Sequence, residues 1–150
     1  MEWQSEARDQ MLTITMPTSL DMIDLAIERS CAFVMDFNLP TNPDLKIVIR
    51  ELLMNAMTHG NRHDPSKPVF FRMSYCGQNR FKIEVKDAGN GFDYQRLNFL
   101  VTEEDQNTRK KRGLVLVNSL AEGLFFSEAG NFVTVFVTLG HNWPRKEDNY

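Results

Sequence analysis

The chain has 150 residues and a formal net charge of −3, with 42% of its residues hydrophobic and 25% charged. A chain of this length and composition can bury a core as one domain, which excludes an intrinsically disordered protein. Because the chain has no basic excess, nucleic acid is a poor candidate partner.

The two ends of the chain differ in pattern from the part between them. Residues 1–10 are charged and lack an apolar run, so they predict a flexible leader rather than a secretory signal. Residues 11–140 hold the periodic patterns of a domain, and 141–150 form a charged tail. No apolar run approaches the roughly 20 residues that span a bilayer, and Cys31 and Cys76 lack metal-ligand spacing. We therefore expect a cytoplasmic protein with reduced cysteines and no membrane partner.

The first part of the domain is predicted to contain a strand and two helices. Residues 11–15 alternate apolar residues with threonine, which is the pattern of a half-buried strand. Apolar residues at three- and four-residue steps then predict a helix from about residue 20 to 37. Asn42 can cap a second helix over 44–61, which Gly60 is expected to end.

The second predicted helix carries an unusual polar side. Glu51, Asn55 and His59 are four residues apart in series, so they stack beside the apolar face of the helix. Asparagine is a middling helix former, which suggests a role for Asn55 other than propensity. These residues alone leave two interpretations open. One is a solvated stripe in which Glu51 pairs with a lysine such as Lys46, and the other is a site for phosphate and metal.

The second part of the domain is predicted to contain two hairpins, separated by a glycine-rich turn, a polar loop and a helix. Period-two alternation predicts the strands, and turn residues between them favour hairpins. The expected elements are a polar loop 61–67, strands 69–75 and 81–85, a turn 86–93, a short helix 94–101, a mobile loop 102–112, a helix from Gly113 to Gly123, and strands 124–127 and 132–139. Hairpins with helices between them predict an α+β fold, a mixed β-sheet with helices layered on one face.

Three motifs occur in order along the chain. They are ELLMNAMTHGN, which holds Glu51 and Asn55, DAGNGFD at 87–93, and RGLVLVNSLAEG at 112–123. Alone, an Asp with two glycines can be a plain turn, and a glycine that opens a helix is a weak phosphate signal. Together they resemble the N box and the two glycine boxes of the GHKL ATPases, which share the Bergerat ATP-binding fold. Within that superfamily, residues 11–139 are most similar to the anti-sigma-factor serine kinases of bacterial partner-switching systems.

This resemblance implies a role for each residue that matches a motif. Glu51 matches the acid that takes a proton from the attacking hydroxyl, and Asn55 matches the amide that binds Mg2+. Asp87 matches the carboxylate that accepts a hydrogen bond from the adenine amino group, and the loop 102–112 would be the ATP lid. The other residues of the implied nucleotide site are Gly89, Gly91 and Phe92 in the glycine turn, Arg109 and Arg112 in the lid, Gly113 and Leu114 at the following helix, and Thr134 in the last strand.

The function that the resemblance implies is that of a cytoplasmic protein serine/threonine kinase that uses ATP and Mg2+. It would phosphorylate an anti-sigma-factor antagonist, a STAS-domain protein, and would hold a sigma factor or another output regulator when free. A homodimer is expected from the resemblance alone.

Two departures from the family pattern keep other functions open. Lys111 stands where the lid usually ends in its first glycine, and Phe132 and Val133 stand where a Gly-Thr dipeptide is common. ATP binding tolerates such changes more easily than phosphoryl transfer does, so the alternative is an ATP-binding regulatory switch without significant kinase activity. A histidine-kinase catalytic domain is a third, weaker interpretation, because only about ten residues precede the first expected strand.

Overall fold

The computed structural model describes residues 2–89, 108–127 and 129–140, with side chains omitted for 108–112. The expected short helix 94–101, most of the expected lid and the tail 141–150 therefore lie outside the described residues. The described elements are β1 (Gln4–Arg8), β2 (Met11–Pro17), α1 (Asp21–Met35), α2 (Pro43–Asn55), the π-helix η1 (Ala56–Gly60), β3 (Pro68–Tyr75), β4 (Arg80–Lys86), α3 (Thr108–Leu120), β5 (Gly123–Phe126) and β6 (Phe132–Thr138).

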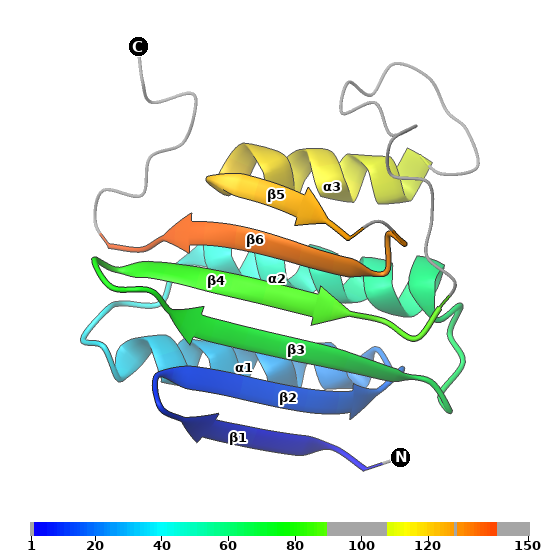
Figure 1. Ribbon diagram of the computed structural model, residues 1–150, viewed down its shortest axis with the longest axis horizontal. Helices are drawn as coiled ribbons and strands as arrows, with labels where there is room; N and C mark the ends of the chain where they lie inside the picture. Colours follow the sequence, from blue (N-terminus) through cyan, green and yellow to red (C-terminus); the bar gives the residue numbers. More distant parts are fainter. Residues whose placement is uncertain (1, 90–107, 128, 141–150) are drawn as a thin grey trace.

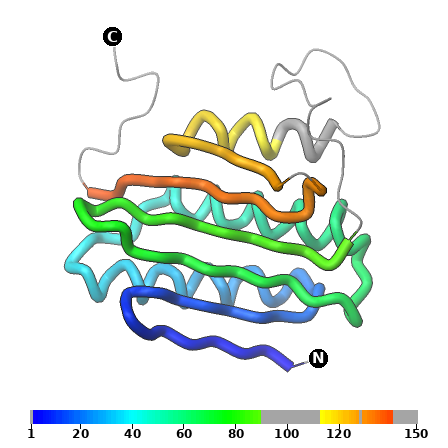
Figure 2. The backbone as a smooth tube through the Cα atoms, viewed as in Figure 1, coloured from blue at the N-terminus to red at the C-terminus, as the bar shows by residue number. Residues whose placement is uncertain are grey.

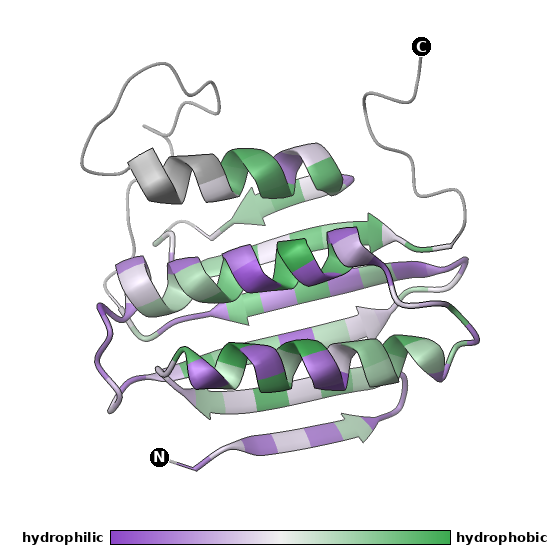
Figure 3. Cartoon of the chain, turned by 180° about the vertical axis from the view of Figure 1, so that it is seen from behind, coloured by the Kyte–Doolittle hydropathy of each residue, from purple (hydrophilic) through white to green (hydrophobic). Residues whose placement is uncertain are grey.

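The strands form one six-stranded sheet in the order β1-β2-β3-β4-β6-β5. The helices α1, α2 and α3 lie on one face of this sheet, as the view from behind shows (Figure 3). These features confirm the predicted α+β fold with helices on one face. The sheet was expected to be mixed, but each strand pair in the described part is antiparallel. The antiparallel pair β2–β3 follows from the two helices between them, because the chain reverses three times, from β2 to α1, from α1 to α2 and from α2 to β3 (Figure 2).

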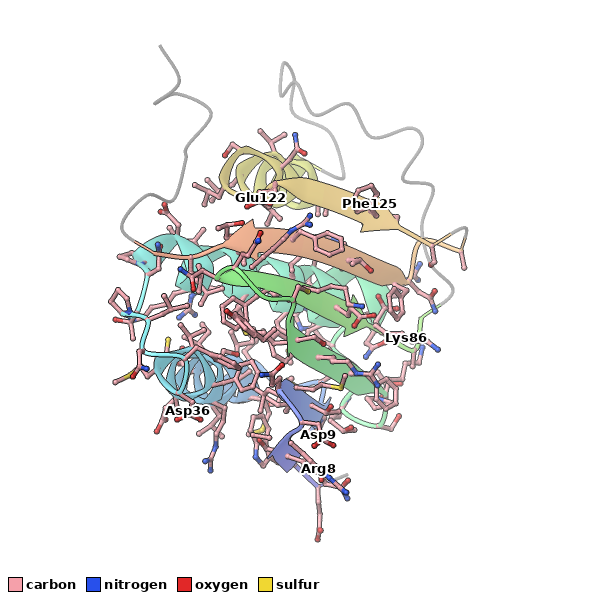
Figure 4. The ribbon with its side chains drawn as sticks, turned by 60° about the vertical axis from the view of Figure 1, so that its left-hand side comes forward. Arg8, Asp9, Asp36, Lys86, Glu122 and Phe125 are labelled. Carbon is pink, nitrogen blue, oxygen red and sulfur yellow. The ribbon has the colours of Figure 1, made fainter. Side chains whose placement is uncertain are left out.

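The core lies between the sheet and the helices. Alternate strand residues face it, such as Ile14, Phe71 and Ile83, each at most 1% exposed. Leu45 and Leu52 of α2 are buried on the other side of the core. The side chain of the N-cap residue of α2 accepts a hydrogen bond of 2.7 Å from the backbone N–H two residues later, as predicted for Asn42. On the opposite face of the sheet, Lys86 and Phe125 are exposed (Figure 4).

Residues 1–10 were expected to form a flexible leader, but part of this segment is a β-strand. Gln4–Arg8 form the edge strand β1, which pairs with β2 along its whole length. Asp9 and Gln10 connect the two strands with φ angles of 53° and 62°, as a tight hairpin turn with both central residues left-handed requires. All five residues of β1 are exposed. Backbone pairing therefore forms this strand without the apolar alternation by which a strand is recognised in a sequence.

Two helix boundaries also differ from the prediction. The helix over 44–61 changes from α to π after Asn55, and the backbone N–H of Asn61 donates to the carbonyl of Ala56 at 2.8 Å. The helix expected from Gly113 begins at Thr108, so the last residues of the expected loop are helical. Arginine and lysine in this segment are good helix formers, which explains the longer helix. No helix in the described part of the chain is long and apolar enough to cross a membrane.

Candidate functional site

The three motifs meet at one pocket between α2, α3 and the adjoining ends of β4 and β6. The residues that line it are Leu52, Asn55, Ala56, Val85, Asp87, Leu114, Phe126, Gly130, Asn131, Phe132 and Val133. Most of these side chains are apolar, so the walls suit a flat, weakly polar ring. The free volume is about 30 Å³, which is room for a water molecule rather than for a purine. A ring-sized ligand would therefore enter as the lining side chains move apart.

Asp87 is the buried acid of this pocket. It follows β4 directly and is 8% exposed. Its Oδ1 accepts a hydrogen bond from the N–H of Gly89 at 2.8 Å, and its own N–H donates to the carbonyl of Asn131 at 3.0 Å. The side chain thus forms the capped turn that the plain-turn interpretation predicts, and it also lines the pocket. A ligand amino group can reach the same carboxylate that shapes the turn.

Two glycines allow the chain to approach this carboxylate closely. A Cβ atom at Gly60 would overlap the carboxylate of Asp87, and a Cβ atom at Gly89 would overlap the carbonyl oxygen of Gly60. A larger residue at position 60 would force the Asp87 side chain to move, and a larger residue at position 89 would force the backbone of Gly60 to move. The π-turn that ends at Gly60 and the glycine turn after β4 therefore fit together as one unit around the acid.

Asn61 holds this unit in place and was not identified from the sequence, where it opened an expected polar loop. It is fully buried, and its Oδ1 accepts a hydrogen bond from the N–H of Ala88 at 2.8 Å. Its Nδ2 donates to Thr18 Oγ1 at 2.8 Å and to the Pro68 carbonyl at 2.9 Å. Asparagine after a helix is common in ordinary turns. Nothing in the local sequence therefore distinguishes Asn61 from a solvated loop residue.

Glu51 and Asn55 of α2 face the N-terminal part of α3. A Cβ atom at Gly113 would lie 2.5 Å from Glu51 Oε2 and 3.6 Å from Asn55 Nδ2. The α3 backbone therefore packs directly on both polar side chains. The ion pair with Lys46, expected for a merely solvated acid, is absent between these two described residues.

The polar side of α2 opens into a hollow of about 290 Å³ next to the pocket. Glu51, Asn55 and His59 all line it, so the predicted common side is confirmed even though His59 lies on the π-turn. Asn55 lines both spaces and joins them. Its Nδ2 is buried and has no hydrogen-bond partner among the described residues. Such a group is costly unless a ligand or water satisfies it, so a polar ligand beside Asn55 fits the site.

A sequence model described as the histidine kinase-like ATPase domain matches residues 24–137. The chain belongs to this family. The search of curated proteins gave no match. Family membership makes this an ATP-binding domain, and it agrees with the antiparallel sheet and the layer of helices. The match spans α2, the turn after β4, α3 and most of β6.

The pocket of this histidine kinase-like ATPase domain contains several of the residues that the sequence predicted. Asn55, Asp87 and Leu114 line it, and Glu51 and Gly113 lie beside it. Buried apolar walls around one carboxylate fit an adenine ring, whose amino group could donate to that carboxylate. The Asn55 amide could supply an oxygen ligand to Mg2+. The described residues contain no cluster of three or more acidic, histidine or cysteine side chains that could hold a metal by itself.

Other predicted residues lie elsewhere or outside the described part. Thr134 is on the face of the sheet opposite to Val133 and Val135, and it is paired with Glu84. The register therefore directs Val133, rather than Thr134, into the pocket. Gly91 and Phe92, and the side chains of Arg109, Lys111 and Arg112, lie outside the described residues.

Proposed function

We propose that this histidine kinase-like ATPase domain is a protein serine/threonine kinase that uses ATP and Mg2+. The observation that carries the proposal is the junction at Asn55, which joins an apolar pocket holding Asp87 to a hollow lined by Glu51. A nucleotide with its base against Asp87 would direct its phosphates toward Asn55 and the part of α3 around Gly113. Because α3 begins at Thr108, Gly113 lies past the first turn, where alone the backbone N–H groups lack partners within the helix, so the proposal assigns the phosphate end to Asn55 and Mg2+.

Each residue then has a chemical task in phosphoryl transfer. Asp87 accepts a hydrogen bond from the adenine amino group, and Asn55 would hold Mg2+ through its amide oxygen. Bound Mg2+ neutralises charge on the phosphates. The hydroxyl oxygen of the protein substrate attacks the γ-phosphorus while the bond from that atom to the β–γ bridging oxygen breaks. Glu51 takes the hydroxyl proton, and ADP leaves with the electron pair of the broken bond.

We further propose that the substrate is an anti-sigma-factor antagonist of the STAS-domain class, and that the unoccupied kinase holds a sigma factor or another output regulator. A homodimer is part of this proposal. The motifs ELLMNAMTHGN, DAGNGFD and RGLVLVNSLAEG support it by their similarity to those of the anti-sigma-factor serine kinases. A cytoplasmic location would follow from such partners.

A direct test incubates the protein with labelled ATP, Mg2+ and a candidate STAS-domain antagonist. Wild type should label a serine or threonine of the antagonist, and Glu51→Gln should reduce the rate by about 100-fold or more, because general-base catalysis contributes that much. Glu84→Gln is the matched control, since Glu84 lies on the other face of the sheet and should retain full activity. Equal labelling by wild type and Glu51→Gln would reject Glu51 as the base.

A second candidate function is a nucleotide-gated switch that binds ATP without transferring phosphate. The specific observation in its favour is that α3 already includes Lys111, at the position where the family usually has a glycine of the lid. A helical segment moves less freely than a glycine-containing loop. The same assay separates the two functions, because a switch would bind ATP tightly and leave every tested antagonist unlabelled.

A further inference from the structure

We infer that Asn61 is a positioning residue that sets the base selectivity of the nucleotide pocket through the turn at 87–89. It does not line the pocket, and it acts through the backbone that follows Asp87. This inference rests on the proposed function, since it takes Asp87 as the acceptor for an adenine amino group.

The side chain of Asn61 joins three segments of the chain. One arm is the hydrogen bond from the Ala88 N–H to Asn61 Oδ1, which fixes the turn after β4. The other arm is the Nδ2 group, which bonds Thr18 at the end of β2 and the carbonyl of Pro68 at the start of β3. Thr18 also donates to the carbonyl of Lys67 at 2.7 Å, so the second arm is itself held at both ends.

The backbone of Asn61 is fixed as well as its side chain. Its N–H closes the π-turn on the carbonyl of Ala56, and its carbonyl accepts a bond of 3.0 Å from the N–H of Asp64. The preceding residue is Gly60, whose Cα packs against the Asp87 carboxylate. Two consecutive residues therefore hold the turn from both sides: Gly60 contacts the acid, and Asn61 bonds the next peptide N–H.

This arrangement separates two consequences of losing the side chain. The Nδ2 arm connects β2 and β3, so its loss should lower stability. The Oδ1 arm touches only the turn, so its loss frees the Ala88 peptide and lets Asp87 change direction. A hydrogen bond to a carboxylate depends strongly on angle and distance, so the preference for a base with an amino group should weaken.

The experiment compares dissociation constants for ATP and for inosine triphosphate, which lacks the adenine amino group. The variants are Asn61→Ala, which removes both arms, and Asn61→Asp, which keeps an acceptor for the Ala88 N–H. Thr18→Val is the matched control, since it removes the Thr18 bonds to Asn61 Nδ2 and to the Lys67 carbonyl and leaves the Oδ1 arm in place. Hydrogen exchange of the Ala88 amide, measured without nucleotide, shows whether the Oδ1 arm is present. All binding is measured well below each unfolding midpoint.

We expect Asn61→Ala to lower the ATP-to-inosine-triphosphate preference by about tenfold and to speed exchange of the Ala88 amide. Asn61→Asp and Thr18→Val should lose stability but keep the preference within about twofold of wild type. An unchanged preference in folded Asn61→Ala would overturn the inference and leave Asn61 a purely structural residue. If Asn61→Ala does not fold, Asn61→Asp provides the test. Loss of the preference for ATP in Asn61→Asp, with the Ala88 amide still protected from exchange, would also overturn the inference. Failure of the proposed function looks different, since wild type itself would then bind both nucleotides equally.

Discussion

At the scale of single residues, one carboxylate among apolar walls is the pocket's candidate for base recognition. We predict that Asp87→Asn raises the dissociation constant for ATP by about tenfold, because hydrogen bonds to charged groups contribute about 1.5–3 kcal/mol and those to neutral ones about half of that. Titration calorimetry at constant salt would measure the change. Glu84→Gln is the control, because Glu84 belongs to β4, the strand that Asp87 follows, and its side chain lies on the opposite face of the sheet. Equal affinities in wild type and Asp87→Asn would remove Asp87 from the nucleotide site.

The residues of the site differ in how visible they are in the sequence. Asp87 and Gly113 were predictable because each belongs to a glycine motif whose spacing is local. Asn61 was not, because its bonds to Thr18 and Ala88 span 43 and 27 residues of the chain. Thr134 was misplaced because a shift of one residue along a strand reverses the face on which a side chain lies. Local pattern thus identifies residues that lie at the pocket, whereas tertiary packing determines which residues hold them in place.

At the scale of elements, the contact between α2 and α3 depends on the absence of a side chain at Gly113. We predict that Gly113→Ala destabilises the protein by about 1–3 kcal/mol, because its Cβ would press on Glu51 Oε2 in a packed interface. In a Glu51→Ala background the same change should be neutral or stabilising by up to about 1 kcal/mol, since alanine is the better helix former. Urea unfolding of the four proteins in this double-mutant cycle measures the coupling. Additive effects would mean that Glu51 does not face α3.

The start of α2 provides a second prediction at this scale. Asn42→Ala removes the side-chain acceptor for the Asp44 N–H and should lower stability by about 1 kcal/mol. For a chain of this size the unfolding midpoint should fall by about 2–4 °C. Asn42→Ser is the conservative control and should recover most of the loss, because serine is an equally good N-cap. Thermal unfolding followed by circular dichroism at one scan rate is the measurement. A midpoint for Asn42→Ala equal to that of wild type would show that the cap contributes nothing.

Helices and strands were predicted well where one buried face produces a regular spacing of apolar residues, and poorly where no face is buried. The hairpin β3–β4 and the helix α2 have one buried face each, and their patterns were correctly interpreted. β1 is exposed at every residue, so no alternation marked it. The π-turn after Asn55 leaves no sequence pattern, and its last residue, Gly60, packs against Asp87 of a distant segment. The undetected features lie next to the site or at the sheet edge, where backbone contacts rather than side-chain burial determine the structure.

At the scale of the whole molecule, the pocket connects parts of the chain that are distant in sequence. Its walls come from α2 in the first half and from α3 and β6 in the second, and α2 and α3 pack against each other on the part of the sheet that holds β4, β6 and β5 (Figure 1). A ligand in this pocket therefore contacts both halves of the core. Global unfolding would have to release it, so binding should stabilise the entire domain rather than one loop.

This linkage gives the last prediction, a rise in the unfolding midpoint with ATP and Mg2+. At a ligand concentration of 100 times the dissociation constant, binding adds about 2.7 kcal/mol, equivalent to about 5–10 °C for a chain of this size. Asp87→Asn, with an affinity about tenfold weaker, should lose about half of that gain at the same concentration. Because the free volume of the pocket is only about 30 Å³, part of the interaction energy must open it. A Val133→Ala variant, which shortens a side chain that the register directs into the pocket, should therefore show a larger rise in midpoint with ATP than wild type, each measured from its own midpoint without ligand. If ATP raises the unfolding midpoint of neither wild type nor any variant, the protein has the fold of the family but does not bind the nucleotide in this pocket.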